Sequence, residues 1–143
     1  MFLALPPSFG DGPTNMAIDV ALLHTLPAGA VAFRHYGWTE PTLTFGYSQR
    51  FEDVRLNSPA GVALCRRPSG GGTVDHRNDW TYALVAQGEH AIAAQPADQL
   101  YRTLHEAVAT ALASLEIDSR LAPCPRRCDQ SPVPPTGPEA CFR

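Results

Sequence analysis

The alternation of apolar and polar residues predicts a chain that mixes strands with helices. Residues 30–36 alternate, with Val31, Phe33 and His35 on one side, as in a strand with two different faces. The polar segment 49–57 predicts a short helical turn between short apolar runs. Glycine and proline turns separate these runs, so strands are expected at 30–36, 42–47, 61–66, 80–86 and 116–121.

Two longer segments carry helix signals. Thr14 and Asn15 offer N-cap side chains to a helix that continues through Leu23, and Pro27 ends it. A second helix opens at residues 96–98. Its apolar residues repeat at the spacing of one helical face, which predicts a stripe that faces the core: Leu100, Leu104, Ala107, Val108, Ala111, Leu112 and Leu115.

The order of these elements predicts the α+β class. Because consecutive strands readily pair as antiparallel neighbours, we expect a mixed, mostly antiparallel sheet flanked by helices. A length of 143 residues suits one hydrophobic core, and we interpret 1–143 as a single domain. Residues 123–138 hold six of the 14 prolines and therefore predict a loop without regular structure.

Composition and charge exclude several classes of protein. The formal net charge of -3 gives no electrostatic reason to bind nucleic acid, and no apolar run approaches the roughly 20 residues of a membrane span. The first residues lack the basic and apolar regions of a secretory signal, so we expect a cytoplasmic protein. Reduced thiols and no metal site are expected from the four cysteines, Cys65, Cys124, Cys128 and Cys141.

All 11 basic residues are arginine, so the chain contains no lysine. A Walker A phosphate loop needs a lysine after its last glycine, and that motif is therefore excluded. Schiff-base chemistry by residues of this chain is excluded for the same reason.

The segment 66–76, Arg-Arg-Pro-Ser-Gly-Gly-Gly-Thr-Val-Asp-His, is the main candidate for chemistry. Three successive glycines cost backbone entropy, which suggests that the backbone itself approaches a ligand closely. Arginine and histidine at its ends favour an anionic or carbonyl-bearing ligand, while a glycine-rich hairpin turn is the alternative. The candidate binding residues are Arg66, Arg67, Ser69, Gly70, Gly71, Gly72, Thr73 and His76.

Three blocks together resemble the lipoate-protein ligase and octanoyltransferase family, which shares its catalytic domain with biotin-protein ligases. Residues 15–19 resemble the first-helix signature, 41–49 a strand with a glycine and a following glutamine, and 66–76 the family's glycine loop. The strand at 81–85 continues the likeness. The resemblance implies that family's fold and the attachment of lipoate or octanoate to a lysine of a lipoyl carrier domain, in a 2-oxoacid dehydrogenase subunit or the glycine-cleavage carrier protein.

Within this resemblance, the glycine loop holds the carbonyl end of the acyl group or an adenylate phosphate with its backbone N–H groups. Only one of Arg66 and Arg67 is expected to point inward, because neighbouring strand residues face opposite sides. His76 falls where the family keeps a histidine lining the acyl site, and a structural histidine is the alternative.

The sequence departs from the family in two places. Arg77 follows the histidine, where relatives often have an acidic residue, and Asp79 lies two positions further on. Relatives also carry a lysine in a segment after a Cys-Phe strand, whereas this chain ends at Cys141-Phe142-Arg143. We therefore expect a domain that is incomplete on its C-terminal side, with a full-length inactive relative as the rival.

Three functions stay open. The main expectation is an ATP-dependent ligase, which makes an acyl-adenylate with Mg²⁺ on the phosphates. The alternative is an octanoyltransferase that needs no ATP, takes its acyl group from acyl-carrier protein and uses Cys141 as nucleophile. Cys141 is otherwise a small buried residue. The third reading, suggested by the missing lysine, is an inactive binding module or one half of a split ligase.

Overall fold

The computed structural model describes residues 1–88 and 90–121, and the strands of this part form two mixed sheets. Sheet A consists of β1 (Phe2–Ala4), β2 (Ser8–Gly10), β3 (Val31–Trp38) and β7 (Thr81–Ala86). Sheet B consists of β4 (Thr42–Phe45), β5 (Ala63–Arg66) and β6 (Val74–Asp75). The helices are α1 (Gly12–Thr25), α2 (Phe51–Leu56) and α3 (Ala97–Ala113).

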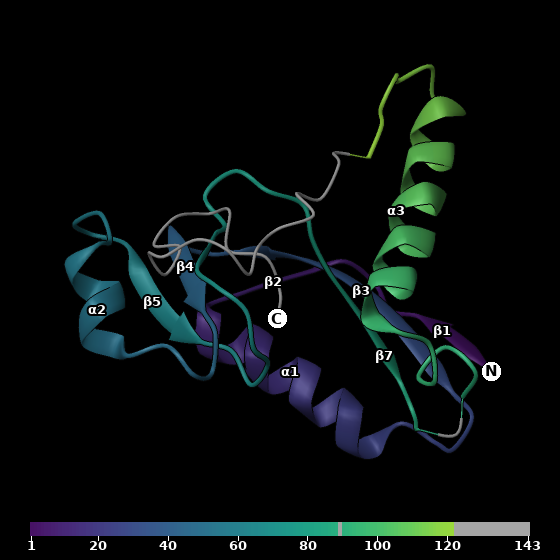
Figure 1. Cartoon of the computed structure of the whole chain (residues 1–143), viewed down its shortest axis with the longest axis horizontal. Coiled ribbons are helices and arrows are strands. Elements are labelled where there is room, and N and C mark those ends of the chain that lie inside the picture. The colour runs from purple at the N-terminus through teal and green to yellow at the C-terminus, as the bar shows by residue number, and fades with distance from the viewer. Residues whose placement is uncertain (89, 122–143) are drawn as a thin grey trace.

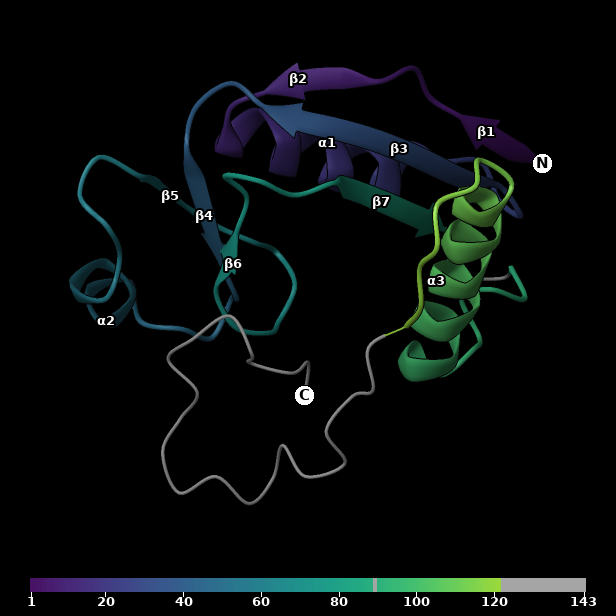
Figure 2. The same cartoon turned by 90° about the horizontal axis from the view of Figure 1, so that it is seen from above.

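The strand pairing makes β3 the centre of sheet A and β4 the centre of sheet B. Both β1 and β2 run parallel to β3 along one of its edges, while β7 runs antiparallel along the other. In sheet B, β4 is parallel to β5 and antiparallel to β6. The two sheets lie side by side, with α1 along one face of sheet A, α2 beside β5, and α3 beside β7 at the opposite end (Figures 1 and 2).

The α+β class, with mixed sheets flanked by helices, is confirmed. Parallel pairing is more frequent than consecutive strands suggested, because β3 and β4 follow each other in the chain but belong to different sheets. The strands expected at 30–36, 42–47, 61–66 and 80–86 correspond to β3, β4, β5 and β7, and the turn at 49–57 contains α2. The described part has no helix long and apolar enough to cross a membrane.

The first helix begins earlier than Thr14 and Asn15 predicted. Asp11 is the N-cap residue, and its Oδ1 accepts a hydrogen bond from the Thr14 backbone N–H at 2.8 Å. The next residue, Gly12, has no room for a side chain, because a Cβ there would lie 2.7 Å from Cys65 Cβ. The predicted cap at Thr14–Asn15 is therefore wrong, since Asn15 lies fully buried inside the helix. The predicted end before Pro27 is confirmed by a C-cap at Leu26.

The described hydrophobic core lies between the end of α1 and sheet A, and consists of Leu26, Ala30, Ala32 and Val85, with Leu3 and Leu22 packed against it. The apolar stripe of α3 is not part of this core. None of its residues is fully buried among the described residues, and Ala107, Ala111 and Leu115 are exposed. Periodicity identifies the apolar face of a helix but not what covers it, so the core-facing prediction is wrong for α3.

The strand predicted at 116–121 is also wrong. The chain leaves α3 through a turn, in which Glu116 has a φ of 59° and the Ile117 N–H bonds to the Leu112 carbonyl at 3.0 Å. These geometries belong to a helix end rather than to an extended strand. The proline-rich segment 123–138 lies outside the described residues.

Candidate glycine-loop site

The segment between β5 and β6, residues 67–73, is called the glycine loop below. It is not a hairpin turn, because β5 and β6 lie on opposite sides of β4 and the loop must cross the end of that strand. Backbone bonds continue past the sheet, from Arg67 N–H to the Phe45 carbonyl at 2.8 Å and from Tyr47 N–H to the Ser69 carbonyl at 2.9 Å. The loop therefore closes over the end of β4.

Two glycines make this close crossing possible. A Cβ on Gly46 would lie 2.0 Å from the carbonyl oxygen of Gly71, which is closer than atoms can approach. Gly71 itself has a φ of 94°, a conformation that L-residues with side chains rarely adopt. Gln49 supports the same turn, since its Oε1 accepts from Gly46 N–H at 2.8 Å. Its Nε2 lies 3.5 Å from the Thr73 hydroxyl.

The two arginines point in different directions, as alternation along β5 predicts. Arg67 is half-buried, and its Nη2 donates to the carbonyls of Gly70 at 3.1 Å and Gly72 at 2.7 Å. Desolvation lowers the pKa of Arg67, although a guanidinium stays charged in proteins. Arg66 is exposed and donates to the carbonyls of Tyr47 and Gln49. Both arginines thus use donors on backbone carbonyls.

Three backbone donors of the loop are unpaired within residues 1–88 and 90–121. The carbonyls of Gly70 and Gly72 turn towards Arg67. The three donors are the N–H groups of Gly70, Gly71 and Gly72, which form no hydrogen bond with another described residue. Adjacent backbone N–H groups around a left-handed residue form a concavity that suits a carbonyl oxygen or an anion.

His76 lies next to the loop with little exposure. Its side chain is 8% exposed and stacks on Trp38, with ring centroids 4.2 Å apart. Nε2 lies 2.8 Å from the Thr44 hydroxyl, and Nδ1 lies 2.5 Å from Asp79 Oδ2. Burial lowers the pKa of His76, with a smaller contribution from the charge of Arg67, while the Asp79 carboxylate opposes the shift.

Sequence reasoning missed the residues that hold His76. Thr44 lies in the block 41–49, but its role there depends on the antiparallel register that pairs it with Val74 and brings it towards His76. In this chain Asp79, rather than the residue directly after the histidine, places a carboxylate on His76. Arg77 instead forms an exposed ion pair with Asp75 at 2.6 Å. A carboxylate three residues after a histidine was the available signal.

The first-helix block, residues 15–19, belongs to a different cluster. Asn15 donates to the carbonyls of Gly10 and Gly37, both at 3.1 Å, and accepts from Arg34. Arg34 is 2% exposed and pairs with Asp19 at 2.6 Å. Tyr36 donates to the same carboxylate, and desolvation followed by the charge of Asp19 raises the pKa of Tyr36. This block fastens α1 to β3, which is a structural task.

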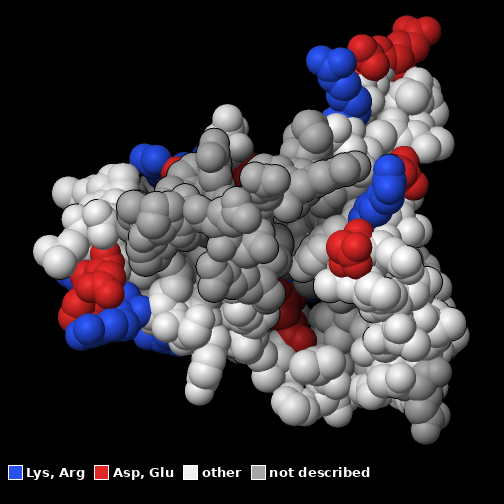
Figure 3. Space-filling view, in the orientation of Figure 1, with Lys and Arg blue, Asp and Glu red and all other residues white. Residues whose placement is uncertain are grey.

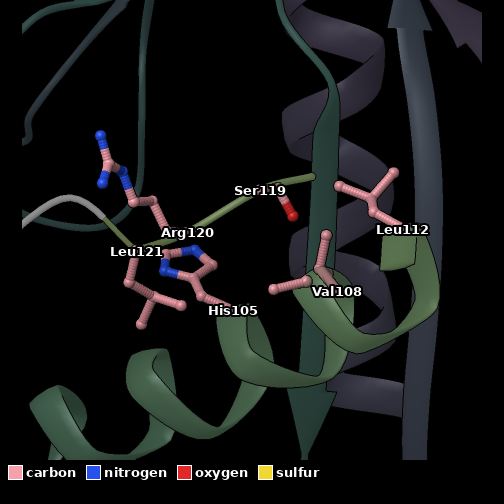
Figure 4. Close-up of a pocket in the computed structure, with 7 residues that line it drawn as sticks. His105, Val108, Leu112, Ser119, Arg120 and Leu121 are labelled. Carbon is pink, nitrogen blue, oxygen red and sulfur yellow. The ribbon is translucent and has the colours of Figure 1, made fainter. Parts of the chain in front are cut away.

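A separate groove of about 450 Å³ lies against α3. Figure 4 shows its lining residues, which come from α3 and the segment that follows: His105, Val108, Ala109, Leu112, Ser119, Arg120 and Leu121. None of the predicted site residues lines it. The candidate nucleophile, Cys141, lies outside the described residues. Within residues 1–88 and 90–121, no group of three metal-ligating side chains occurs.

Charge on the visible face is mixed. Figure 3 shows acidic and basic side chains next to each other over α2, whose sequence contains Glu52, Asp53 and Arg55. Another mixed pair, Arg102 and Glu106, lies on α3. Mixed charge at both places gives no single-sign surface for docking a partner.

Comparisons with known proteins agree on one family. The lipoyl protein ligase A/B catalytic domain matches residues 11–129. An octanoyltransferase LipM from Anoxybacillus flavithermus is 33% identical over 113 residues, which are 76% of this chain and 41% of that protein. An octanoyltransferase LipM from Carboxydothermus hydrogenoformans is 33% identical over 128 residues, which are 86% of this chain and 48% of that protein.

Two solved structures share the fold. Lipoate-protein ligase A bound with ATP superposes with a TM-score of 0.63 at 25% identity, covering 85% of this chain and 49% of that one. A protein from T. acidophilum with bound lipoic acid superposes with a TM-score of 0.62 at 25% identity, covering 92% of this chain and 54% of that one. The chain thus spans about half the length of the proteins it matches.

Proposed function

This chain belongs to the lipoyl protein ligase A/B catalytic domain family, and on that premise we propose that it takes part in octanoyl transfer. The octanoyl group would come from acyl-carrier protein and pass to a lysine of a lipoyl carrier domain. Sequence reasoning put an ATP-dependent ligase first. The similarity to octanoyltransferases supports the alternative instead.

The observation that carries the proposal is the set of backbone N–H groups at Gly70, Gly71 and Gly72. A thioester carbonyl gains negative charge on oxygen when it is attacked, and fixed N–H donors stabilise that charge. Gly71 gives the loop its left-handed turn, and Arg67 holds two of its carbonyls away from the site. These features support the loop as the place of the acyl carbonyl.

The use of the arginines also supports transfer without ATP. A nucleotide triphosphate calls for cationic donors directed at its phosphates. Arg66 and Arg67 instead donate to backbone carbonyls. Under this proposal neither ATP nor Mg²⁺ takes part, whereas lipoate-protein ligase A has a structure bound with ATP.

The proposed chemistry proceeds in two balanced steps. The Cys141 thiolate attacks the thioester carbonyl of octanoyl-acyl-carrier protein, so a new thioester forms on Cys141 and the carrier thiol leaves. The amine of the lipoyl-domain lysine then attacks that thioester. An amide forms, the amine loses a proton, and the Cys141 thiol is restored.

Partners and location follow from this chemistry. The acceptor is a lipoyl carrier domain of a 2-oxoacid dehydrogenase subunit or the glycine-cleavage carrier protein, and the donor is acyl-carrier protein. We keep the cytoplasm as the proposed location. A lysine that assists transfer must come from outside these 143 residues, and an acyl-binding module without turnover is the second candidate function.

Incubation of the full chain with octanoyl-acyl-carrier protein tests the proposal. Intact-protein mass spectrometry is expected to find one added octanoyl group, lost in Cys141→Ser and retained in Cys65→Ser, because Cys65 is buried. A parallel reaction with octanoate and ATP is expected to show no ATP–pyrophosphate exchange. Exchange would establish the ligase instead. Octanoyl binding without an adduct on Cys141 would establish the binding module.

A further inference from the structure

Four side chains next to the glycine loop form a continuous chain of hydrogen bonds. The Arg67 Nη1 lies 2.7 Å from the Thr44 hydroxyl, which lies 2.8 Å from His76 Nε2. The other ring nitrogen, His76 Nδ1, lies 2.5 Å from Asp79 Oδ2. The chain therefore connects a carboxylate to the guanidinium that holds the loop carbonyls.

The chemistry of both ends fixes the direction of each bond. The Arg67 guanidinium can only donate, so the Thr44 oxygen accepts from it. At the far end, the Trp38 indole N–H can only donate, and it does so to the Thr81 hydroxyl at 2.9 Å. The Thr81 hydroxyl in turn donates a hydrogen bond to Asp79 at 3.0 Å, and a carboxylate only accepts.

The Thr44 hydroxyl then decides where His76 carries its proton. Thr44 is fully buried, and its hydroxyl meets only Arg67 and His76 among the described residues. A proton on Nε2 would make Thr44 accept twice and leave its own hydroxyl proton buried without an acceptor, which is unfavourable. Donation from Thr44 to a bare Nε2 satisfies every group, and Nδ1–H then donates to Asp79.

We infer that Thr44, His76 and Asp79 are positioning residues which hold the glycine loop through Arg67, with His76 neutral and its proton on Nδ1. Both ring nitrogens are occupied, so His76 is not a free acid or base. The inference deepens the proposed function and rests on it only in that the loop is the proposed place of the acyl carbonyl. The protonation state of His76 and the rigidity of the loop can be measured whether or not the chain transfers octanoyl groups.

Protonation of His76 reverses one bond of this chain. A proton on Nε2 would face the Thr44 oxygen, which already accepts from Arg67, and would put a second positive charge near that guanidinium. The charged groups that face His76 are Asp75, Asp79 and Arg67, and its neighbours from β3, β4 and β7 are uncharged. Burial and Arg67 lower the pKa of His76, so the loop is expected to be ordered at neutral pH and looser in acid.

The test is ¹⁵N NMR on the full chain without substrate. Long-range proton–nitrogen correlation is expected to show Nδ1 protonated and Nε2 bare in His76 at neutral pH. Relaxation of the glycine amides in the loop is expected to give order parameters of about 0.85, falling below about 0.6 in Thr44→Val. Thr44→Ser keeps the hydroxyl and is expected to restore both results, and acid is expected to loosen the wild-type loop as Thr44→Val does.

A proton on Nε2 of the wild type, or a loop as rigid in Thr44→Val as in the wild type, would overturn the inference. If circular dichroism shows Thr44→Val unfolded, Asp79→Leu breaks the exposed end of the same chain and takes its place. An unchanged tautomer and loop in that variant count against the inference equally. Because no readout needs an acyl donor, its failure and the failure of octanoyl transfer remain distinguishable.

Discussion

At the scale of single residues, the contact between Gly46 and Gly71 determines how closely the loop covers β4. The space at Gly46 is filled by backbone, because the Gly71 carbonyl would lie 2.0 Å from an added Cβ. Backbone cannot rotate aside as a flexible side chain can. The loop must therefore move whenever Gly46 gains a side chain.

Gly46→Ala is expected to lower the free energy of unfolding by about 1–3 kcal/mol, the usual cost of overpacking, and to weaken binding of an octanoyl thioester. Urea denaturation and a binding titration measure the two effects. Gly88→Ala is the matched control, since an added Cβ there meets no atom within 4 Å and Gly88 lies outside the glycine loop. Equal effects of both substitutions would contradict the assignment of the close contact.

A second prediction concerns acid. The folded-state pKa of His76 lies below the ordinary value of 6.5, so between these two values the unfolded chain binds a proton that the folded chain does not. His76 therefore contributes stability that is fully present above pH 6.5 and is lost as the pH falls through its folded pKa. Urea denaturation at a series of pH values is expected to show a steeper loss in the wild type than in His76→Gln. Parallel curves would refute it.

The sequence identified the glycine loop and His76 as candidates but not their support. The glycines and the histidine can be read directly from the sequence, whereas the role of Thr44 depends on which residue of β6 lies opposite it. Register is set by long-range pairing, which a local pattern does not contain. The direction of Arg67 was predictable in kind from alternation, while its carbonyl partners were not.

At the scale of elements, α1 is held to sheet A by buried polar contacts as well as by apolar packing. Arg34 on β3 is 2% exposed and pairs with Asp19, while the Asn15 side chain donates to backbone carbonyls on β2 and β3. Hydrophobic periodicity gives no sign of this cluster, because its members are polar. The helix and its end before Pro27 were predictable from the sequence, but its cap at Asp11 and its buried polar anchor were not.

Arg34→Met is expected to lower the free energy of unfolding by about 3–5 kcal/mol, because it leaves the Asp19 carboxylate without its buried partner. Chemical denaturation provides the measurement. Arg102→Met makes the same change in an exposed pair with Glu106 on α3, where about 0.5 kcal/mol or less is expected. A similar loss in both variants would show that the Arg34 cluster contributes nothing special.

At the scale of the whole molecule, α1 contacts both sheets. Its body packs on sheet A, and its first residue, Gly12, meets Cys65 of β5 in sheet B. The mixed α+β class followed from the order of elements. The division into two sheets did not, because nothing in the sequence between β3 and β4 distinguishes a change of sheet from a hairpin.

Cys65 reports on this junction. Burial, with a smaller effect of Asp11, raises the pKa of the Cys65 thiol, so its reactive thiolate is scarce in the folded state. In a variant with serine at positions 124, 128 and 141, iodoacetamide is expected to label Cys65 slowly, and faster in Gly12→Ala. Rapid labelling before any loss of circular dichroism in the parent variant would mean that sheet B opens from α1 independently.

The edge of sheet A formed by β1 and β2 is poorly suited to pairing with a strand of another molecule. The two strands have three residues each and are separated by Pro6 and Pro7, which have no N–H to donate. A strand from another molecule could not form an unbroken ladder along this edge. The paired prolines thus protect the exposed side of the sheet from the strand addition that begins aggregation.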